Sequence, residues 1–176
     1  MDTLFDPVAH QDILRRVESL QAGSERQWGT MTVAQMLEHT ARAIEMAAGK
    51  KPSKQAPLGK MIGWMFRKDF MGPKPFGRNA PTGPDFVVQG EPDFSRTKQR
   101  LKTLLGEFHG LGERGCEGNV HGFFGRMTGA EWGVTQHKHL DHHLRHPTPP
   151  PRAVPGTFTP RLCPTGPRCG IGGSRM

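Results

Sequence analysis

The stretch that decides the fold is Thr128–His146, TGAEWGVTQHKHLDHHLRH, which holds five of the nine histidines. Thr128 stands three residues before Glu131. This spacing is typical of a capping box, in which each side chain accepts a hydrogen bond from a backbone N–H at the start of a helix. In the predicted helix, His139 and His143 lie one turn apart on the same face, because each residue advances by about 100°. Two imidazoles at this spacing can share one metal ion.

The same helix geometry shows which other residues of this segment lie near His139 and which point away from it. Trp132 lies about 20° from His139, two turns earlier, and is expected to line the pocket around the ion. His142 lies about 60° away and is expected to support the ligands without binding the ion itself. His137 points about 160° away, which excludes it from the same ion. His146 is followed by a proline, where the helix should end, and no role is assigned to it.

Three earlier segments also have apolar residues at helical spacing, namely residues 7–21, 33–48 and 94–112. Asp6 followed by Pro7 is a favourable start for the first of these helices. Thr32 and Gln35 form a second capping-box pattern at the start of the next one. Residues 112–119, GERGCEGN, are rich in glycine and are predicted to form a loop.

One histidine of the predicted helix over residues 33–48 is informative. His39 lies about 60° from Met36 and about 40° from Ala43, at the border of the apolar stripe. A border histidine is usually a polar residue at the edge of a buried face. The same position allows a side chain to reach into the mouth of a helix bundle. His39 is therefore the candidate for a third ligand.

Residues 50–93 form the long connection between two of the predicted helices. Within it, residues 58–71 are predicted as a short amphipathic helix that covers the bundle and buries Ile62, Met65 and Phe66. Residues 72–86 contain four prolines, which exclude a helix interior there. A connection of this length in a compact domain is often functional, so we expect it to lie over the site.

The chain carries a formal charge of +8, which invites a nucleic-acid-binding interpretation. Residues 147–176 contain four of the 24 lysines and arginines and no acid, so residues 1–146 carry only +4. This excess is ordinary and lacks interleaved aromatic residues, so no nucleic-acid partner is expected. No segment reaches the roughly 18 apolar residues of a membrane helix. Three cysteines and an acidic N-terminus favour a cytoplasmic protein without a membrane partner.

Residues 147–176 differ in composition from the rest of the chain, with eight of the 16 prolines and little to bury. Such a segment cannot offset its ordering entropy and is predicted to be a disordered tail. Two explanations stay open: a non-native end produced by a shifted reading frame, or a genuine basic tail. Cys163 and Cys169 lack the partners of a zinc site. The predicted folded domain is residues 1–146.

These elements predict an all-α fold, a four-helix bundle with a long Pro-rich crossover and a disordered C-terminal tail. Sites in such bundles are built from side chains on facing helices that point inward. The candidate metal ligands are His39, His139 and His143, and the expected ion is Zn²⁺ or Ni²⁺. The alternative is that the histidines are only solvated, as at many histidine-rich helix ends. Three protein ligands leave a coordination position open, which is typical of a catalytic site. No catalytic residue is assigned.

Three segments resemble a bacterial branch of the DinB/YfiT-like superfamily: WGTMTVAQMLEHTARAIEMAAG, the crossover through NAPTGPDF, and HGFFGRMTGAEWGVTQHKHLDHHLR. The resemblance covers residues 1–146 and is most specific in the last segment. It implies a DinB-like four-helix bundle with one metal ligand from the second helix and an H-x3-H pair from the last. These positions fall on His39, His139 and His143, and His142 is the additional histidine of the pair.

The chain departs from similar proteins at two points. Relatives continue the last helix as L-R-Q-F-G or similar, whereas this chain turns to His146 and a proline, which weakens support for the last helical turn. Position 137 is usually aromatic in relatives, and the sequence offers no functional interpretation of His137.

The resemblance implies a metal-dependent enzyme in which a divalent ion activates a thiol or water against a small electrophilic substrate. Characterised members include thiol transferases that use bacillithiol, mycothiol or glutathione, and other members have no known activity. Thiol transfer is therefore favoured over hydrolysis, and a low-molecular-weight thiol is an expected partner. The alternative is a non-catalytic metal-binding or stress-related helical bundle. A homodimer through helix faces is compatible with either function.

Overall fold

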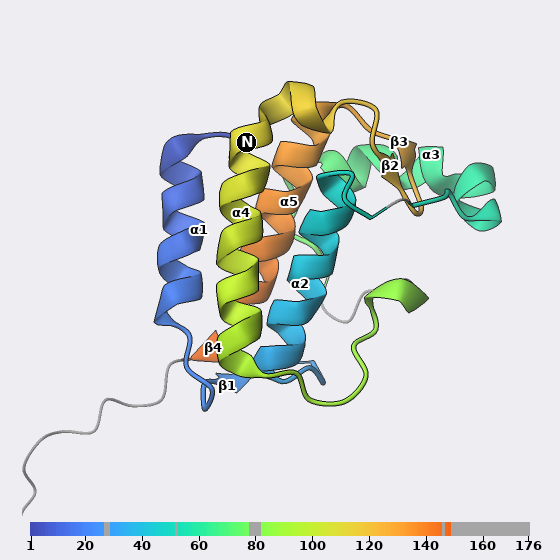
Figure 1. Cartoon of the computed structure of the whole chain (residues 1–176). Coiled ribbons are helices and arrows are strands. Elements are labelled where there is room, and N and C mark those ends of the chain that lie inside the picture. Colours follow the sequence, from blue (N-terminus) through green and yellow to red (C-terminus); the bar gives the residue numbers. More distant parts are fainter. Residues whose placement is uncertain (27–28, 52, 78–81, 146, 149–176) are drawn as a thin grey trace, which may run out of the picture.

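The computed structural model describes residues 1–26, 29–51, 53–77, 82–145 and 147–148. Four long helices lie side by side (Figure 1), namely α1 (Pro7–Ser19), α2 (Val33–Ala47), α4 (Phe94–Cys116) and α5 (Gly129–Leu144). Both α1 and α2 pack against α4 and α5. The predicted all-α bundle is confirmed. The disordered tail was predicted over residues 147–176, of which residues 149–176 lie outside the described residues.

The helices begin at the predicted capping residues. The Asp6 carboxylate accepts hydrogen bonds from the backbone N–H groups that follow it, both at 2.9 Å. Thr32 with Gln35 and Thr128 with Glu131 form complete capping boxes at the starts of α2 and α5. These contacts satisfy backbone donors that have no partner inside a helix. The start of the histidine-bearing helix is therefore fixed by its own sequence.

The core of the bundle receives large apolar side chains from all four helices. The largest fully buried side chains include Trp132, Phe108, Ile13, Leu37, Ile44, Leu101 and Leu140. Burial of side chains of this size stabilises a fold by roughly 1.5–3 kcal/mol each. The histidines of α2 and α5 are therefore carried on rigid, well-packed elements.

The long connection is required by the direction of the helices. α2 and α4 run in the same direction in the bundle (Figure 1). The chain between them, residues 48–93, must therefore run back along the length of the bundle. This return contains a fifteen-residue helix, α3 (Pro57–Met71), and a short 3-10 helix, η1 (Pro84–Phe86). α3 packs against α5 and projects from the side of the bundle (Figure 1).

The prediction for the buried face of α3 is wrong. Met65 and Phe66, which were expected to be buried, are 57% and 49% exposed. Gly59 and Gly63 form the packing face instead. A Cβ atom at Gly59 would lie 2.2 Å from the Phe123 carbonyl oxygen, so only glycine allows this close approach.

The predicted loop over residues 112–119 is also partly wrong, because α4 continues to Cys116. Gly112 makes a kink with φ of +60°, a conformation that favours glycine, and the last turn follows it. Cys116 is fully buried there. A small hairpin of β2 (Val120–His121) and β3 (Gly125–Arg126) then leads into α5.

A second two-stranded ladder joins the connection between α1 and α2 to the residues that follow α5. β1 (Glu25–Arg26) pairs antiparallel with β4 (Pro147–Thr148). The described chain therefore continues past residue 146, the predicted end of the domain, by one short strand. Among the described residues, no helix combines the length and apolar character needed to cross a bilayer.

Candidate metal centre

His39 of α2 and His139 and His143 of α5 come together in one cluster, as the sequence predicted. Nε2 of His139 lies 3.0 Å from Nε2 of His39 and 3.1 Å from Nε2 of His143. All three candidate ligand atoms lie within 4.8 Å of one another. In the described part of the chain, this is the one group of three or more potential ligands that converges in this way.

The spacing of the nitrogens fits a single divalent ion. Imidazoles that bind Zn²⁺ tetrahedrally at about 2.0–2.1 Å have nitrogens about 3.3 Å apart. The two separations that involve His139 therefore need to open by only a few tenths of an ångström, and the ligand atoms of His39 and His143 lie within 4.8 Å of each other. His39 and His143 are buried, whereas His139 is partly exposed.

The orientation of His39 is fixed by the chain that crosses over it. Its Nδ1–H donates a hydrogen bond to the Phe86 carbonyl oxygen at 3.0 Å. A carbonyl oxygen only accepts, so Nδ1 must carry the proton and Nε2 is left with its lone pair toward the cluster. A hydrogen bond of this kind is the usual support for a metal-binding histidine.

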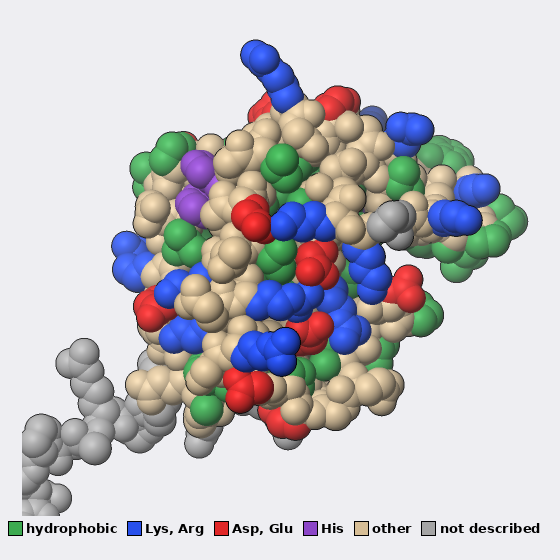
Figure 2. Space-filling model, in the orientation of Figure 1, with side chains coloured by type: hydrophobic (Ala, Val, Ile, Leu, Met, Phe, Trp, Pro, Cys, Tyr) green, Lys and Arg blue, Asp and Glu red, His purple; other side chains and the backbone are tan. Residues whose placement is uncertain are grey.

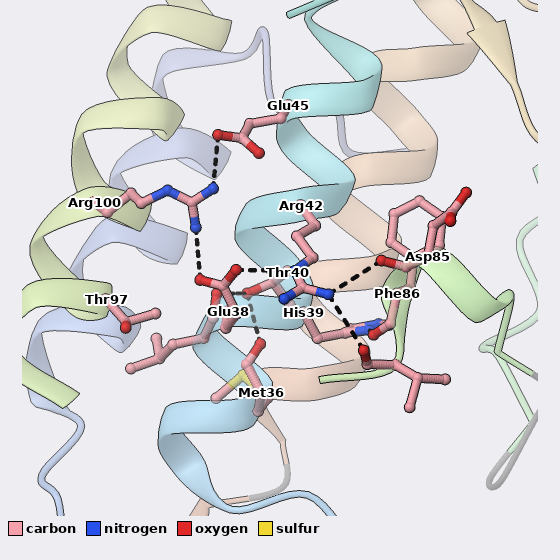
Figure 3. A network of polar contacts seen from close by, with 12 residues as sticks. Met36, Glu38, His39, Thr40, Arg42, Glu45, Asp85, Phe86, Thr97 and Arg100 are labelled. Atoms are coloured by element: carbon pink, nitrogen blue, oxygen red, sulfur yellow. Dashed lines mark hydrogen bonds and ion pairs between the residues drawn. The ribbon is translucent and has the colours of Figure 1, made fainter. Parts of the chain in front are cut away.

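A network of charged side chains holds the Phe86 carbonyl in place (Figure 3). One guanidinium nitrogen of Arg42 donates to the carbonyl oxygens of Asp85 and Val87, both at 3.2 Å, and so holds η1 against α2. Arg42 Nε also donates to Glu38 at 2.9 Å, and Glu38 accepts from Arg100 of α4. The position of His39 therefore depends on contacts among α2, α4 and the crossover.

Two histidines of the cluster, His39 and His139, favour the neutral form that binds metal. Burial holds the pKa of His139 well below its usual value, and the neighbouring His143 and His39 lower it further. Burial is also the main cause that lowers the pKa of His39, with a smaller contribution from Arg42. Because metal and proton compete for the same lone pair, a low pKa favours the metal near neutral pH.

Aromatic side chains from the crossover cover the cluster, as expected for a functional connection. The Phe86 ring lies edge-on to His39 with centroids 6.1 Å apart. The Phe76 ring lies 6.4 Å from the His139 ring and stacks on Phe70 of α3 at 4.7 Å. The side of the cluster that faces the crossover is therefore largely apolar.

A cavity of about 510 Å³ adjoins this aromatic wall. Its lining combines polar and apolar side chains, including Phe76, His137, Lys138, Asp141, His142 and Arg145. The His142 ring lies 6.0 Å from the Phe76 ring and 5.1 Å from the His143 ring. His142 and Phe76 therefore lie between the cavity and the three-histidine cluster. His137 lines the cavity and does not join the three-histidine group.

His121, in β2, is a residue near the cluster that the sequence did not single out. Burial lowers its pKa to about 4, with a further contribution from Arg67. The backbone N–H groups of Phe123 and Phe124 donate to its Nδ1 at 3.0 and 3.2 Å, so the neutral ring carries its proton on Nε2. Trp132, expected to line the metal pocket, lies 5.7 Å from the His121 ring.

Trp132 and Cys116 both face the interior of the bundle. Trp132 is fully buried and donates its indole N–H to the Asn119 carbonyl oxygen at 3.3 Å. Burial raises the pKa of the Cys116 thiol to about 11, so it is a thiol rather than a thiolate at neutral pH. Cys116 is therefore a core residue and not a nucleophile.

The fold and the site together define a helical-bundle protein with a candidate three-histidine metal centre. Residues 6–150 match the family model described as "Protein of unknown function (DUF1569)", so the chain belongs to that family. Comparison with curated proteins and with solved structures found no match.

Proposed function

We propose that the protein is a metal-dependent enzyme of the DinB-like type, in which Zn²⁺ or Ni²⁺ bound by His39, His139 and His143 activates a thiol or water. The observation that carries the proposal is the convergence of three imidazoles from the facing helices α2 and α5. Nε2 of His139 lies about 3 Å from Nε2 of His39 and of His143, and all three ligand atoms lie within 4.8 Å of one another. Bound there, the ion would lower the pKa of a thiol or water ligand and so supply a nucleophile.

The chain's own residues have defined tasks in this proposal. His39, His139 and His143 hold the ion, and the Phe86 carbonyl keeps the His39 lone pair directed at it. The apolar faces of Phe76 and Phe86 limit the access of water to the reacting groups. Low solvent access strengthens electrostatic interactions at such a site.

The thiol in this proposal comes from a small molecule. In the described part of the chain, Cys116 is the single cysteine, and it is fully buried with a raised pKa. The cavity of about 510 Å³ beside His142 and Phe76 has the size of a small-molecule site. We assign it to the thiol or to the electrophile, with Lys138 and His137 at its wall.

Metal binding is tested on protein purified without a histidine tag, stripped with a chelator and loaded with Zn²⁺ or Ni²⁺. We expect about one ion per chain and a rise in melting temperature on loading, since a ligand at about 100 times its Kd stabilises by roughly 2.7 kcal/mol. His139→Ala should lose the ion. His137→Ala, on the other side of the same helix, is the matched control and should keep it. Equal metal content in wild type and His139→Ala would reject the proposal.

Catalysis is tested separately with the loaded protein. Bacillithiol, mycothiol and glutathione are each combined with an aryl halide electrophile, and an activated ester reports water as the nucleophile. Turnover that is lost in His139→Ala and kept in Arg96→Gln, at an exposed position on α4 away from the cavity, supports the enzyme. Bound metal without turnover in any of these assays would favour the non-catalytic metal-binding bundle.

A further inference from the structure

α3 has its apolar face turned outward. Gly59 and Gly63 face the hairpin, where a Cβ atom would lie 2.2 and 2.8 Å from the Phe123 carbonyl oxygen. The opposite face carries large apolar side chains that are well exposed: Leu58 (59%), Met61 (72%), Trp64 (73%) and Met65 (57%). A surface helix usually turns its apolar stripe toward the core. Here the stripe is presented to the surroundings.

This orientation is held firmly by contacts of α3 with the rest of the domain. Arg67 donates to both carboxylate oxygens of Glu131 on α5, at 3.0 and 2.6 Å. It also donates to the carbonyl oxygens of Phe124 and Arg126 in the hairpin, both at 3.0 Å. Gln55, just before α3, donates to the Phe123 carbonyl oxygen at 3.0 Å. The helix therefore cannot rotate its apolar face inward without breaking these bonds.

The charge around the exposed face is positive. Lys60 and Lys68 lie one turn before and one turn after Trp64, on the same side of the helix, and both are exposed. Within the described part of the chain, neither makes an ion pair. Asp69 is the one acid in the sequence of α3. Figure 2 shows hydrophobic side chains with lysine and arginine among them at the projecting edge of the molecule.

We propose that α3 is an interfacial helix that docks the protein on the surface of an anionic phospholipid bilayer. Leu58, Met61, Trp64 and Met65 would enter the boundary between headgroups and acyl chains, and Lys60 and Lys68 would reach the lipid phosphates. Lysines that flank aromatic and aliphatic side chains on the outward side of a helix suit such binding, because the basic groups are attracted to anionic lipids while the apolar groups are buried in the interface. Tryptophan favours this boundary because its ring is apolar and its N–H is polar.

Charge complementarity favours a bilayer over a second copy of this chain. Antiparallel packing of two α3 helices about Trp64 would place Lys60 of each copy beside Lys68 of the other, and like charges repel. A phosphate surface neutralises the same lysines. The sequence alone predicts no membrane partner, and docking through α3 differs from that prediction for peripheral contact. It is independent of the proposed metal chemistry.

The test is co-sedimentation of the full chain with vesicles of phosphatidylcholine alone or of phosphatidylcholine and phosphatidylglycerol in equal parts. We expect binding to the anionic vesicles that weakens as salt rises from about 0.05 M to about 0.5 M, because salt screens the lysine–phosphate attraction. Lys60→Gln with Lys68→Gln should weaken binding by roughly 30-fold, at about 5-fold per lysine. Trp64→Gln with Met61→Gln should weaken it by at least about 10-fold.

Two variants outside α3 serve as controls. Val8→Gln removes an apolar side chain of α1 that is 79% exposed, and Arg96→Gln removes an exposed charge of α4. Both should bind vesicles like the wild type. The proposal fails if anionic vesicles bind no better than neutral ones, or if the α3 and control variants bind equally. A dimer in solution that Trp64→Gln dissociates, without vesicle binding, would overturn it in favour of self-association.

Discussion

Histidines pack against one another between helices at two places in this bundle, and the geometries of the two places differ. Between α2 and α5, His39, His139 and His143 direct Nε2 atoms at one point, with ring planes inclined by 65–81°. Between α1 and α4, His10 and His109 stack face to face, with centroids 4.2 Å apart and planes inclined by 13°. In the stacked pair, His109 Nδ1–H donates to the Leu4 carbonyl oxygen at 2.9 Å.

This contrast shows that burial and proximity alone do not make a metal site. A histidine lone pair lies in the plane of its ring, so two parallel stacked rings cannot direct their lone pairs at one ion between them. Inclined rings can do so. His10 Nε2 is buried without a hydrogen-bond partner among the described residues, which is a cost to stability. The stacked pair is therefore a packing feature, and the inclined cluster is the candidate site.

The largest expected effect comes from removing one histidine at each place. His143→Ala should weaken Zn²⁺ binding by at least about 100-fold, because it removes a ligand and not only its support. His109→Ala should leave the affinity unchanged. Competition with a chelator of known affinity measures both. If both variants lost Zn²⁺ affinity to a similar extent, the stacked pair could not be separated from the metal site.

A smaller effect is expected from loosening the support of His39. Arg42→Gln removes the contacts that hold the Asp85 and Val87 carbonyls and should weaken metal binding by about 10-fold, the lower range for residues behind a ligand. Arg96→Gln, at an exposed position on α4, is the control. An unchanged affinity in Arg42→Gln would show that His39 is positioned without this network.

The stacked pair should contribute to stability rather than to metal binding. His109→Phe removes the hydrogen bond to the Leu4 carbonyl and should lower the free energy of unfolding by about 1 kcal/mol. Denaturant unfolding of the metal-free protein measures this. The metal affinity of the same variant should match the wild type, and a loss of affinity would contradict the separation of the two places.

The smallest effect concerns pH. Burial and then His109 lower the pKa of His10, so below about pH 6.5 the unfolded chain binds a proton that the folded chain does not. With respect to His10, the free energy of unfolding therefore keeps its full value above this pH. It declines as the pH falls toward the pKa of His10 in the folded chain. In His10→Phe, the slope of the unfolding free energy against pH should be smaller than in the wild type. The difference should correspond to the uptake of less than one proton on unfolding. An identical slope in wild type and variant would exclude His10 as a contributor.

The sequence predicted those parts of the site that depend on neighbouring residues. The capping box of Thr128 and Glu131 and the spacing of His139 and His143 are local, and helix geometry alone placed the pair on one face. His39 could be named because a stripe border is visible within a single helix. The Phe86 carbonyl could not be found in this way. It meets His39 only because the crossover folds back over α2.

The outward face of α3 shows a second limit of periodicity. Helical spacing determines which residues share a face, but it does not determine which face turns inward. The large apolar side chains around Met61 and Met65 were expected inside. Close approach of the hairpin to Gly59 and Gly63 decided the opposite orientation. His121 was missed for a related reason, since its neighbours come from other elements.

The positions of the ligands along the chain have a consequence for folding. His39 and His139 are 100 residues apart, so an ion bound to both would act as a cross-link between the early and the late part of the chain. Closing a loop of this length removes unfolded-state entropy worth on the order of 4 kcal/mol in a chain-entropy model. During synthesis, His39 emerges long before its partners. A chain that ends before α5 lacks His139 and His143 and so cannot hold the ion. Bound metal would therefore indicate that the whole bundle has been synthesised and has folded.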